Sequence, residues 1–261
     1  MVATALTLSR GFSDRVTDLL DRLDYRLIET DHEREQIFRL RYDAYLREGA
    51  IAPNFIKKLS DRFDDAENAW TFGLHVDGKI VSSIRICVSS SEHPMTPAVE
   101  AFSDLLGAET ERGKIIIDSN RFVADAKVAR SFPELPYLTV RLAYLASVYF
   151  DADIGTATAR REHQAFYKRV FGCKPISEPR PYPTVTKPLL LMVVDCRSES
   201  AHQKILARYP YFRSTFFERR MLFERPALPR RTAAMLQAKL PSANVNEDAE
   251  AAAAAISVRG R

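Results

Sequence analysis

The 261-residue chain is poor in cysteine and has no long apolar stretch. Its three cysteines, Cys87, Cys173 and Cys196, form no C-x-x-C pair, and its five histidines are equally scattered. This spacing argues against a disulfide framework and gives no signal of a metal site. No apolar run approaches the roughly 20 residues of a membrane-spanning helix. The first ten residues lack the basic start and apolar centre of a signal peptide, so we expect a cytoplasmic protein.

The charge of the chain is unevenly distributed. The formal net charge is +4, yet residues 201–231 hold eight Lys or Arg against two Asp or Glu, a local excess of 8 − 2 = +6. Such a segment attracts an anionic partner, which could be nucleic acid, a phospholipid surface or an acidic protein. A solvated basic face is the alternative interpretation.

Two charged residues stand inside aliphatic runs that otherwise read as buried strands: Arg85 within Ile80–Val88 and Asp118 within Ile115–Val123. A buried charge is costly unless it is paired or lines a wet cavity. We predict that both residues border one site, and the alternative is a buried structural ion pair between them. Asp118 and Arg121 would face opposite sides of a regular strand, so we expect a bulge near Ser119 to bring them together.

Apolar periodicity predicts an alternation of helices and strands along most of the chain. The strongest local signal is Asp77-Gly78 between two strand patterns, which is typical of a type I′ hairpin turn. The expected helices are 12–23, one beginning after Asp31, 99–106, 135–150 and 162–171. The expected strands are 25–29, 70–76, 79–88, 114–123, 153–159, 173–177 and 189–194. Hairpins followed by alternating helices and strands favour an α+β fold around a mixed sheet.

The composition divides the chain into four predicted segments. Residues 1–24 form a leading helix and residues 25–197 the main α+β domain. Residues 198–240 form a basic helical segment, and the alanine-rich polar residues 241–261 are expected to be disordered.

The element order resembles the GNAT acyltransferase superfamily, and residues 163–176 are similar to its late helix-to-strand signature. The motifs Arg41-Tyr42-Asp43-Ala44-Tyr45, Ser83-Ile84-Arg85 and Asp118-Ser119-Asn120-Arg121-Phe122, with an aspartate-bearing loop after the first, occur in the order seen in autoinducer synthases. The later segment Arg180-Pro181-Tyr182-Pro183 resembles the related N-acyl amino acid synthases in particular. The resemblance covers residues 25–196.

This resemblance implies a GNAT-like mixed, mostly antiparallel sheet flanked by helices. It also implies transfer of a fatty acyl group to the amine of an amino acid or related small molecule. The donor would be the acyl-phosphopantetheine of acyl carrier protein, with no tightly bound cofactor. Residues 124–136 contain no glycine, whereas coenzyme A-dependent relatives carry a glycine-bearing pyrophosphate loop there. Acyl-coenzyme A remains the alternative donor.

Two further departures bear on function. Autoinducer synthases usually carry a tryptophan soon after the first motif, where this chain has residues 48–51 without one, so lactone synthesis is less expected. The tyrosine of many GNAT enzymes stands four residues before the glycine, but Tyr167 stands five before Gly172.

Amide formation from a thioester needs a neutral amine, stabilisation of the oxyanion and a proton for the leaving thiolate. We predict direct attack without a covalent acyl-enzyme, because the chain has no G-x-S-x-G elbow. Asp118 is the predicted base or amine anchor, with structural pairing as the alternative. Tyr167 is the predicted proton donor to the thiolate, with an ordinary core aromatic as the alternative.

The remaining candidates are predicted to bind substrate. Arg85 and Arg121 could hold an acceptor carboxylate bidentately, or could belong to an internal ion-pair network. Arg41 is expected to pair with Asp61 or Asp64 and so fix the loop over the acceptor, although a solvated Arg41 is also compatible with the sequence. His163 is a weaker candidate.

Other functions remain open. One is acyl-homoserine-lactone synthesis from S-adenosylmethionine, and another is a coenzyme A-dependent GNAT acyltransferase. A third is a non-catalytic module whose basic segment binds nucleic acid. The partners we expect are acyl carrier protein, a small amine and a membrane surface contacted peripherally, and nucleic acid is not expected.

Overall fold

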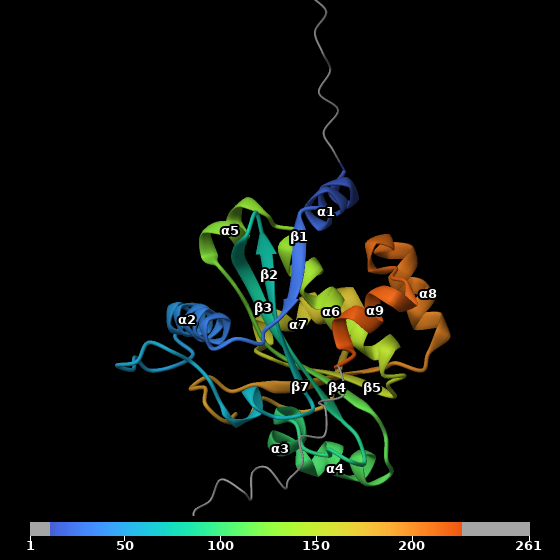
Figure 1. Ribbon diagram of the computed structural model, residues 1–261. Coiled ribbons are helices and arrows are strands. Elements are labelled where there is room, and N and C mark those ends of the chain that lie inside the picture. The colour runs from blue at the N-terminus through green and yellow to red at the C-terminus, as the bar shows by residue number, and fades with distance from the viewer. Residues whose placement is uncertain (1–10, 226–261) are drawn as a thin grey trace, which may run out of the picture. The chain divides into compact units, whose positions relative to one another are not determined.

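The computed structural model describes residues 11–225 (Figure 1). The predicted tail, residues 241–261, lies outside the described residues, as do residues 226–240 of the basic segment. No helix in the described range is long and apolar enough to cross a membrane.

The strands of the described range form one sheet in the order β1-β2-β3-β4-β5-β7-β6. Neighbouring strands are antiparallel except for β4 and β5, which run parallel. The predicted α+β fold with a mixed, mostly antiparallel sheet is therefore confirmed. The strands are β1 (Leu23–Leu27), β2 (Ala69–Val76), β3 (Lys79–Ser89), β4 (Ile116–Ala124), β5 (Ile154–Ala159), β6 (Lys174–Pro175) and β7 (Leu190–Asp195).

The β2–β3 hairpin turns at the predicted dipeptide. Asp77 and Gly78 both have positive φ, 51° and 76°, which is the backbone that a type I′ turn requires. The sequence signal and the structure agree because the turn chemistry is local.

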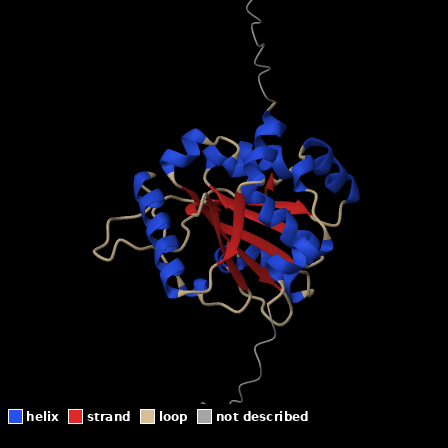
Figure 2. Ribbon diagram, turned by 45° about the horizontal axis from the view of Figure 1, so that its top comes forward, coloured by secondary structure: helices blue, strands red, loops and turns tan. Residues whose placement is uncertain are grey.

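Helices cover both faces of the sheet (Figure 2). They are α1 (Phe12–Leu20), α2 (Asp31–Arg47), α3 (Pro97–Ala101), α4 (Ser103–Glu111), α5 (Ala126–Ser131), α6 (Leu135–Tyr149), α7 (Gln164–Phe171), α8 (Glu199–Arg208) and α9 (Phe216–Phe223). Short 3₁₀ turns stand at η1 (Arg62–Asp64), η2 (Arg161–His163) and η3 (Pro210–Phe212).

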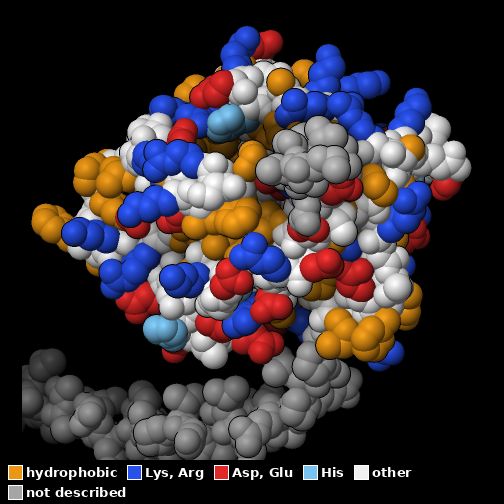
Figure 3. Space-filling view, turned by 90° about the horizontal axis from the view of Figure 1, so that it is seen from above, with side chains coloured by type: hydrophobic (Ala, Val, Ile, Leu, Met, Phe, Trp, Pro, Cys, Tyr) orange, Lys and Arg blue, Asp and Glu red, His pale blue; other side chains and the backbone are white. Residues whose placement is uncertain are grey.

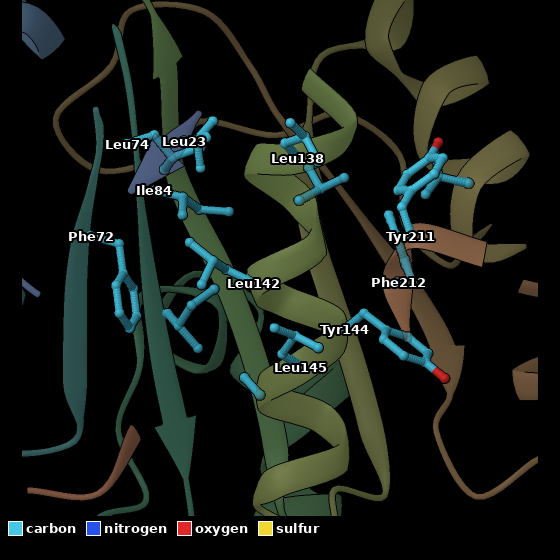
Figure 4. Packing of buried hydrophobic residues seen from close by; sticks show 14 of the residues in the cluster. Leu23, Phe72, Leu74, Ile84, Leu138, Leu142, Tyr144, Leu145, Tyr211 and Phe212 are labelled. Atoms are coloured by element: carbon cyan, nitrogen blue, oxygen red, sulfur yellow. The ribbon is translucent and has the colours of Figure 1, made fainter. Parts of the chain in front are cut away.

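Helix α6 lies at the centre of the main core. Leu138, Leu142 and Leu145 point from it toward the sheet, while Tyr211 and Phe212 pack on its other side (Figure 4). A helix that is apolar on most of its surface is buried on most of its surface, and this one is enclosed between the sheet and the C-terminal part of the described chain.

A buried arginine of α6 fixes this C-terminal part. Arg141 Nε donates to the Tyr211 carbonyl at 2.7 Å, and Nη2 donates to the Arg213 carbonyl at 2.9 Å. Its Nη1 pairs with Glu218 at 2.7 Å. The basic helices after β7 thus share the main core. The predicted segment boundaries stay predictions, although the one at residues 24/25 falls within β1.

Some expected elements differ in detail. The helix expected at residues 99–106 is two helices, α3 and α4, and the strand expected at 173–177 shortens to β6. Helix α5 was not expected. Helix α2 is capped by Thr30, whose hydroxyl accepts from the Glu33 N–H, while Asp31 is already helical.

Candidate active site

Strands β4 and β5 separate partway along their length. They pair in parallel from Ile116 opposite Ile154 to Ser119 opposite Ala157, and then each continues without the other. A cavity of about 380 Å³ opens at this separation. Its lining combines apolar residues with charged ones: Ala44, Tyr45, Arg47, Glu48, Ala50, Arg85, Ser119, Asn120, Arg121, Phe122, Val123, Ala124, Pro136, Thr158, Ala159, Arg160, His163, Phe166, Tyr167, Tyr182, Val185, Lys187 and Leu189.

A β-bulge in β4 accompanies the separation. Ser83 pairs with Val123 and Arg85 with Asn120, so Arg121 and Phe122 together oppose the single residue Ile84. Arg121 has a φ of 52°, a conformation that non-glycine residues rarely adopt. A bulge was expected near Ser119, and the structure places it two residues later. It turns Arg121 to the face of the sheet that carries Arg85.

Asp61 joins these two arginines. Its Oδ1 accepts from Arg85 Nη1 at 2.7 Å, and its Oδ2 accepts from Arg121 Nη2 at 2.5 Å. Asp61 also caps η1 by accepting from the Phe63 N–H at 2.9 Å. The two guanidiniums hold the pKa of Asp61 far below its usual range and outweigh the opposing effect of burial. The loop carrying Asp61 is therefore held against β3 and β4.

Asp64 extends the network to helix α2. Its Oδ1 lies 2.7 Å from Arg41 Nη1 and 2.8 Å from Arg85 Nη1, and the side chains of Arg41 and Asp64 are almost completely buried. The structure thus contains the pairing expected between Arg41 and Asp64. The role of each residue in substrate binding stays a prediction.

Three arginines and two aspartates make up this network, so its net charge is 3 − 2 = +1. Two donors of Arg41, Nε and Nη2, are buried without a hydrogen-bond acceptor among the described residues. Arg85 and Arg121 line the cavity, whereas Arg41 lies behind them and is not part of its lining.

Asp118 is placed differently from the sequence-based interpretation. The ion pair with Arg85 that was weighed as an alternative is absent, because Arg85 binds the two loop aspartates and donates from Nε to Asn120 at 2.8 Å. Asp118 accepts from the Ala98 N–H at 2.8 Å and is fully buried. It is not among the residues that line the cavity, so the amine contact predicted for it is not supported by this geometry.

Tyr167 and His163 both border the cavity, from α7 and the turn before it. Burial raises the pKa of Tyr167 far above its usual value, so the phenol keeps its proton at neutral pH. Partial burial is the main cause that lowers the pKa of His163, and the positive charge of Arg160 adds to it. The imidazole is therefore neutral at pH 7. Tyr167 and Ser119 also line a narrow apolar cavity of about 50 Å³ beneath α6.

The rim of the larger cavity carries charged residues that the sequence did not single out. Arg160 binds Glu48 at 2.6 Å, and Lys187 Nζ donates to the Glu48 carbonyl at 2.6 Å. Arg47 completes the set. The sequence could have indicated Arg160 as a site residue, because it directly follows the strand pattern at 153–159. Its neighbours from the end of α2 and from the loop before β7 are brought to it only by the folded structure.

No cluster of three or more His, Cys, Asp or Glu side chains suited to a metal occurs within residues 11–225. None of the curated proteins matches this chain. Among solved structures, FeeM, an N-acyl amino acid synthase from uncultured soil microbes, is 23% identical with a TM-score of 0.57, covering 72% of this chain and 98% of FeeM.

BjaI, a coenzyme A-dependent acyl-homoserine lactone synthase solved with S-adenosylmethionine and isopentyl-CoA, is 14% identical with a TM-score of 0.50, covering 72% of this chain and 89% of BjaI. These two likenesses support the fold. The family model of the N-acyl amino acid synthase FeeM matches residues 36–195, more than half of the chain. The protein is therefore an acyltransferase that belongs to the FeeM N-acyl amino acid synthase family.

Proposed function

We propose that the protein transfers a fatty acyl group from acyl carrier protein to the amine of an amino acid, and that the amine attacks the thioester directly. The observation that carries this proposal is the cavity at the β4–β5 separation. It combines apolar walls, which suit an acyl chain, with the cationic network at Arg85 and Arg121, which suits an acceptor carboxylate.

The backbone after β4 supports a carrier-protein donor over coenzyme A. A pyrophosphate is usually held by free N–H groups at a helix N-terminus. Here Asp125 Oδ1 accepts from the Lys127 and Val128 N–H groups, each at 2.9 Å, at the start of α5. A carboxylate already occupies that position, and its charge would repel phosphate.

The start of α6 is equally unsuited to a diphosphate. Glu134 precedes the helix, and Pro136 lacks an N–H. The Glu134 side chain is almost completely buried and pairs with Arg15 at 2.5 Å. A phosphopantetheine arm attached to a carrier protein needs no such diphosphate site.

Direct transfer is supported by the state of the thiols. Burial raises the pKa of Cys87 and of Cys173 to about 12 and that of Cys196 to about 11. A thiol with such a pKa supplies almost no thiolate at neutral pH, so none is suited to form an acyl-enzyme. The Ser119 hydroxyl donates to the Thr156 carbonyl at 3.0 Å, and no base among residues 11–225 hydrogen-bonds to it.

In this mechanism a bond forms between the amine nitrogen and the acyl carbon, and the carbon–sulfur bond breaks. We assign the amine proton, taken through water, to the neutral His163 imidazole, which must first give up the hydrogen bond that Arg160 Nη2 donates to its Nε2 at 3.1 Å. We assign to the protonated Tyr167 the transfer of a proton to the departing thiolate. We assign Asp118 a positioning role, because it binds the first turn of α3 and lies outside the cavity lining. The reaction would take place in the cytoplasm.

The test is a transfer assay with the purified full-length chain, long-chain acyl carrier protein and an amino acid mixture, followed by mass spectrometry of extracted lipid. We expect N-acyl amino acid, with the carrier protein preferred over acyl-coenzyme A by kcat/KM. A lactone formed from S-adenosylmethionine, or a preference for acyl-coenzyme A, would contradict the proposal. No transfer from either donor to any amino acid would contradict it as well.

A further inference from the structure

A fully exposed aromatic side chain projects from the loop that follows α2. Phe55 has a relative exposure of 104% and the adjacent Ile56 of 67%, so neither packs against the protein. They stand at the tip of the loop Asn54–Lys58, which extends away from the body after α2 (Figure 1). Apolar side chains protrude at the same edge of the molecule in the space-filling view (Figure 3).

The base of this loop is anchored. Asn54 Nδ2 donates to the Lys58 carbonyl at 3.0 Å, and the Asn54 N–H donates to the Tyr42 hydroxyl at 3.4 Å. The Leu59 N–H donates to the Phe38 carbonyl of α2 at 3.0 Å. These bonds fix the direction in which the tip points, so the exposure of Phe55 follows from a defined loop conformation.

The charges around the tip are positive. Residues 50–60 contain Lys57 and Lys58 and no acidic residue. Lys58 pairs with Glu35 at 3.2 Å, whereas Lys57 is exposed and has no ion pair within the described range. Two apolar side chains next to a free lysine match an interface in which the acyl region lies beside anionic headgroups.

The loop also adjoins the cavity rim. Ala50 lines the cavity only four residues before Asn54, and its carbonyl accepts from the Thr186 N–H at 2.8 Å. Arg47, which is exposed, and Lys187, which is half-buried, are cations that line the same cavity. The loop is therefore joined to the cavity wall through the short segment 51–53.

We propose that the loop Asn54–Lys58 docks the enzyme onto an anionic lipid bilayer, with Phe55 and Ile56 entering the acyl boundary and Lys57 meeting phosphate headgroups. A bilayer is favoured over a protein partner because the two side chains protrude from the surface. The proposal goes beyond the acyl-transfer function. The proposed function enters only in the advantage that docking would give, which is release of a long-chain product into the lipid.

The test is co-sedimentation of the full-length chain, without substrates, with phosphatidylcholine vesicles that contain or lack phosphatidylglycerol. We expect binding to the anionic vesicles only, weakened by salt. The double change Phe55→Ser with Ile56→Ser should reduce binding about tenfold or more, given the apolar area removed. Lys57→Glu should reduce it about fivefold or more.

The matched control is Phe216→Ser with Phe217→Ser, a pair that is similarly exposed on α9 at 67% and 69%. It should leave vesicle binding unchanged. In Phe55→Trp, emission should shift to the blue with anionic vesicles, against the buried Trp70 as a constant background. Equal binding by the loop variant and the unaltered chain, loss of binding in the α9 variant alone, or no binding to either vesicle would overturn the proposal.

Acyl-transfer kinetics measured without vesicles distinguish lipid docking by the loop from carrier-protein docking and from a lid over the acceptor. The Phe55→Ser/Ile56→Ser variant should keep the KM for carrier protein and for acceptor within about twofold. A raised KM for carrier protein would make the loop a protein-docking element, and a raised KM for acceptor would make it a lid. Either result would overturn lipid docking. Vesicle binding is measured without substrate. A failure of the acyl-transfer proposal would therefore not change the outcome of the vesicle-binding experiment.

Discussion

Arg85 and Asp61 form a two-point ion pair at the wall of the cavity, with Nη1–Oδ1 at 2.7 Å and Nη2–Oδ2 at 3.1 Å. The two residues are 24 positions apart in sequence, on β3 and on the loop before β2. Arg121 shares the same carboxylate. Asp64 of the same loop also pairs with Arg85 at 2.8 Å, so two aspartates attach the loop to the sheet, and Asp61 is the one that joins both strand arginines.

Asp61→Asn should destabilise the fold strongly. The change leaves Arg85 and Arg121, both almost fully buried, without that counter-charge, and breaking a buried pair costs about 3–5 kcal/mol. The free energy of unfolding from urea titration measures this. As a control, Asp77→Asn removes an exposed pair with Arg22 and should cost less than about 1 kcal/mol. Similar losses in the two variants would mean that the network contributes little.

The same pair gives stability a defined pH dependence. The pKa of Asp61 is lower in the folded chain than in the unfolded chain. Its contribution is therefore complete above the unfolded-state value of about 4 and is lost as the pH falls toward the folded-state value. The free energy of unfolding should decline below about pH 4. In Asp61→Asn this part of the decline should disappear, and an unchanged acid profile would argue against the assignment.

Asp118→Asn should have the opposite effect on stability. Burial raises the pKa of Asp118 against the influence of the Ala98 N–H, so the folded state prefers the protonated carboxyl. Stability is then lost as the pH rises from the unfolded-state value through the folded-state value. The uncharged variant should gain stability relative to the original chain at pH 7, and gain less near pH 4.

Transfer activity of this variant separates positioning from catalysis. We expect Asp118→Asn to keep kcat within about tenfold, because its side chain does not reach the cavity. A loss of about 100-fold or more, with the fold intact, would restore the catalytic role predicted from the sequence.

Tyr167→Phe should lower kcat about 100-fold with little change in either KM, because the phenol is assigned a proton transfer and no binding contact. An activated aryl thioester donor, whose thiolate leaves without protonation, should recover most of the rate. The control is Tyr149→Phe, which removes a hydroxyl from α6 outside the cavity. Equal rates for Tyr167→Phe and the unaltered enzyme with the natural donor would remove Tyr167 from the mechanism.

The cysteines should resist alkylation in the folded protein. Their raised pKa values predict slow reaction of Cys87, Cys173 and Cys196 with iodoacetamide at pH 8, and fast reaction after unfolding. Intact-mass measurement counts the adducts, and transfer activity should survive the native treatment. Rapid modification of one cysteine with loss of activity would reopen an acyl-enzyme route.

Features with local causes could be predicted from the amino-acid sequence. The hairpin followed from Asp77-Gly78, because that dipeptide accepts the positive φ angles of its turn. The buried helix α6 followed from its apolar surface. Arg85 and Asp118 were recognisable as unusual because a charge in a buried strand needs compensation.

The partner of each buried charge depends on contacts between elements that are distant in sequence. Arg85 turned to the loop aspartates and left Asp118 beneath α3, and the bulge in β4 brought Arg121 to the same carboxylate. The separation of β4 from β5, which opens the cavity, likewise arises from register between distant segments. Pairing of charges and strands depends on distances between elements that are remote along the chain, and no local residue pattern encodes those distances.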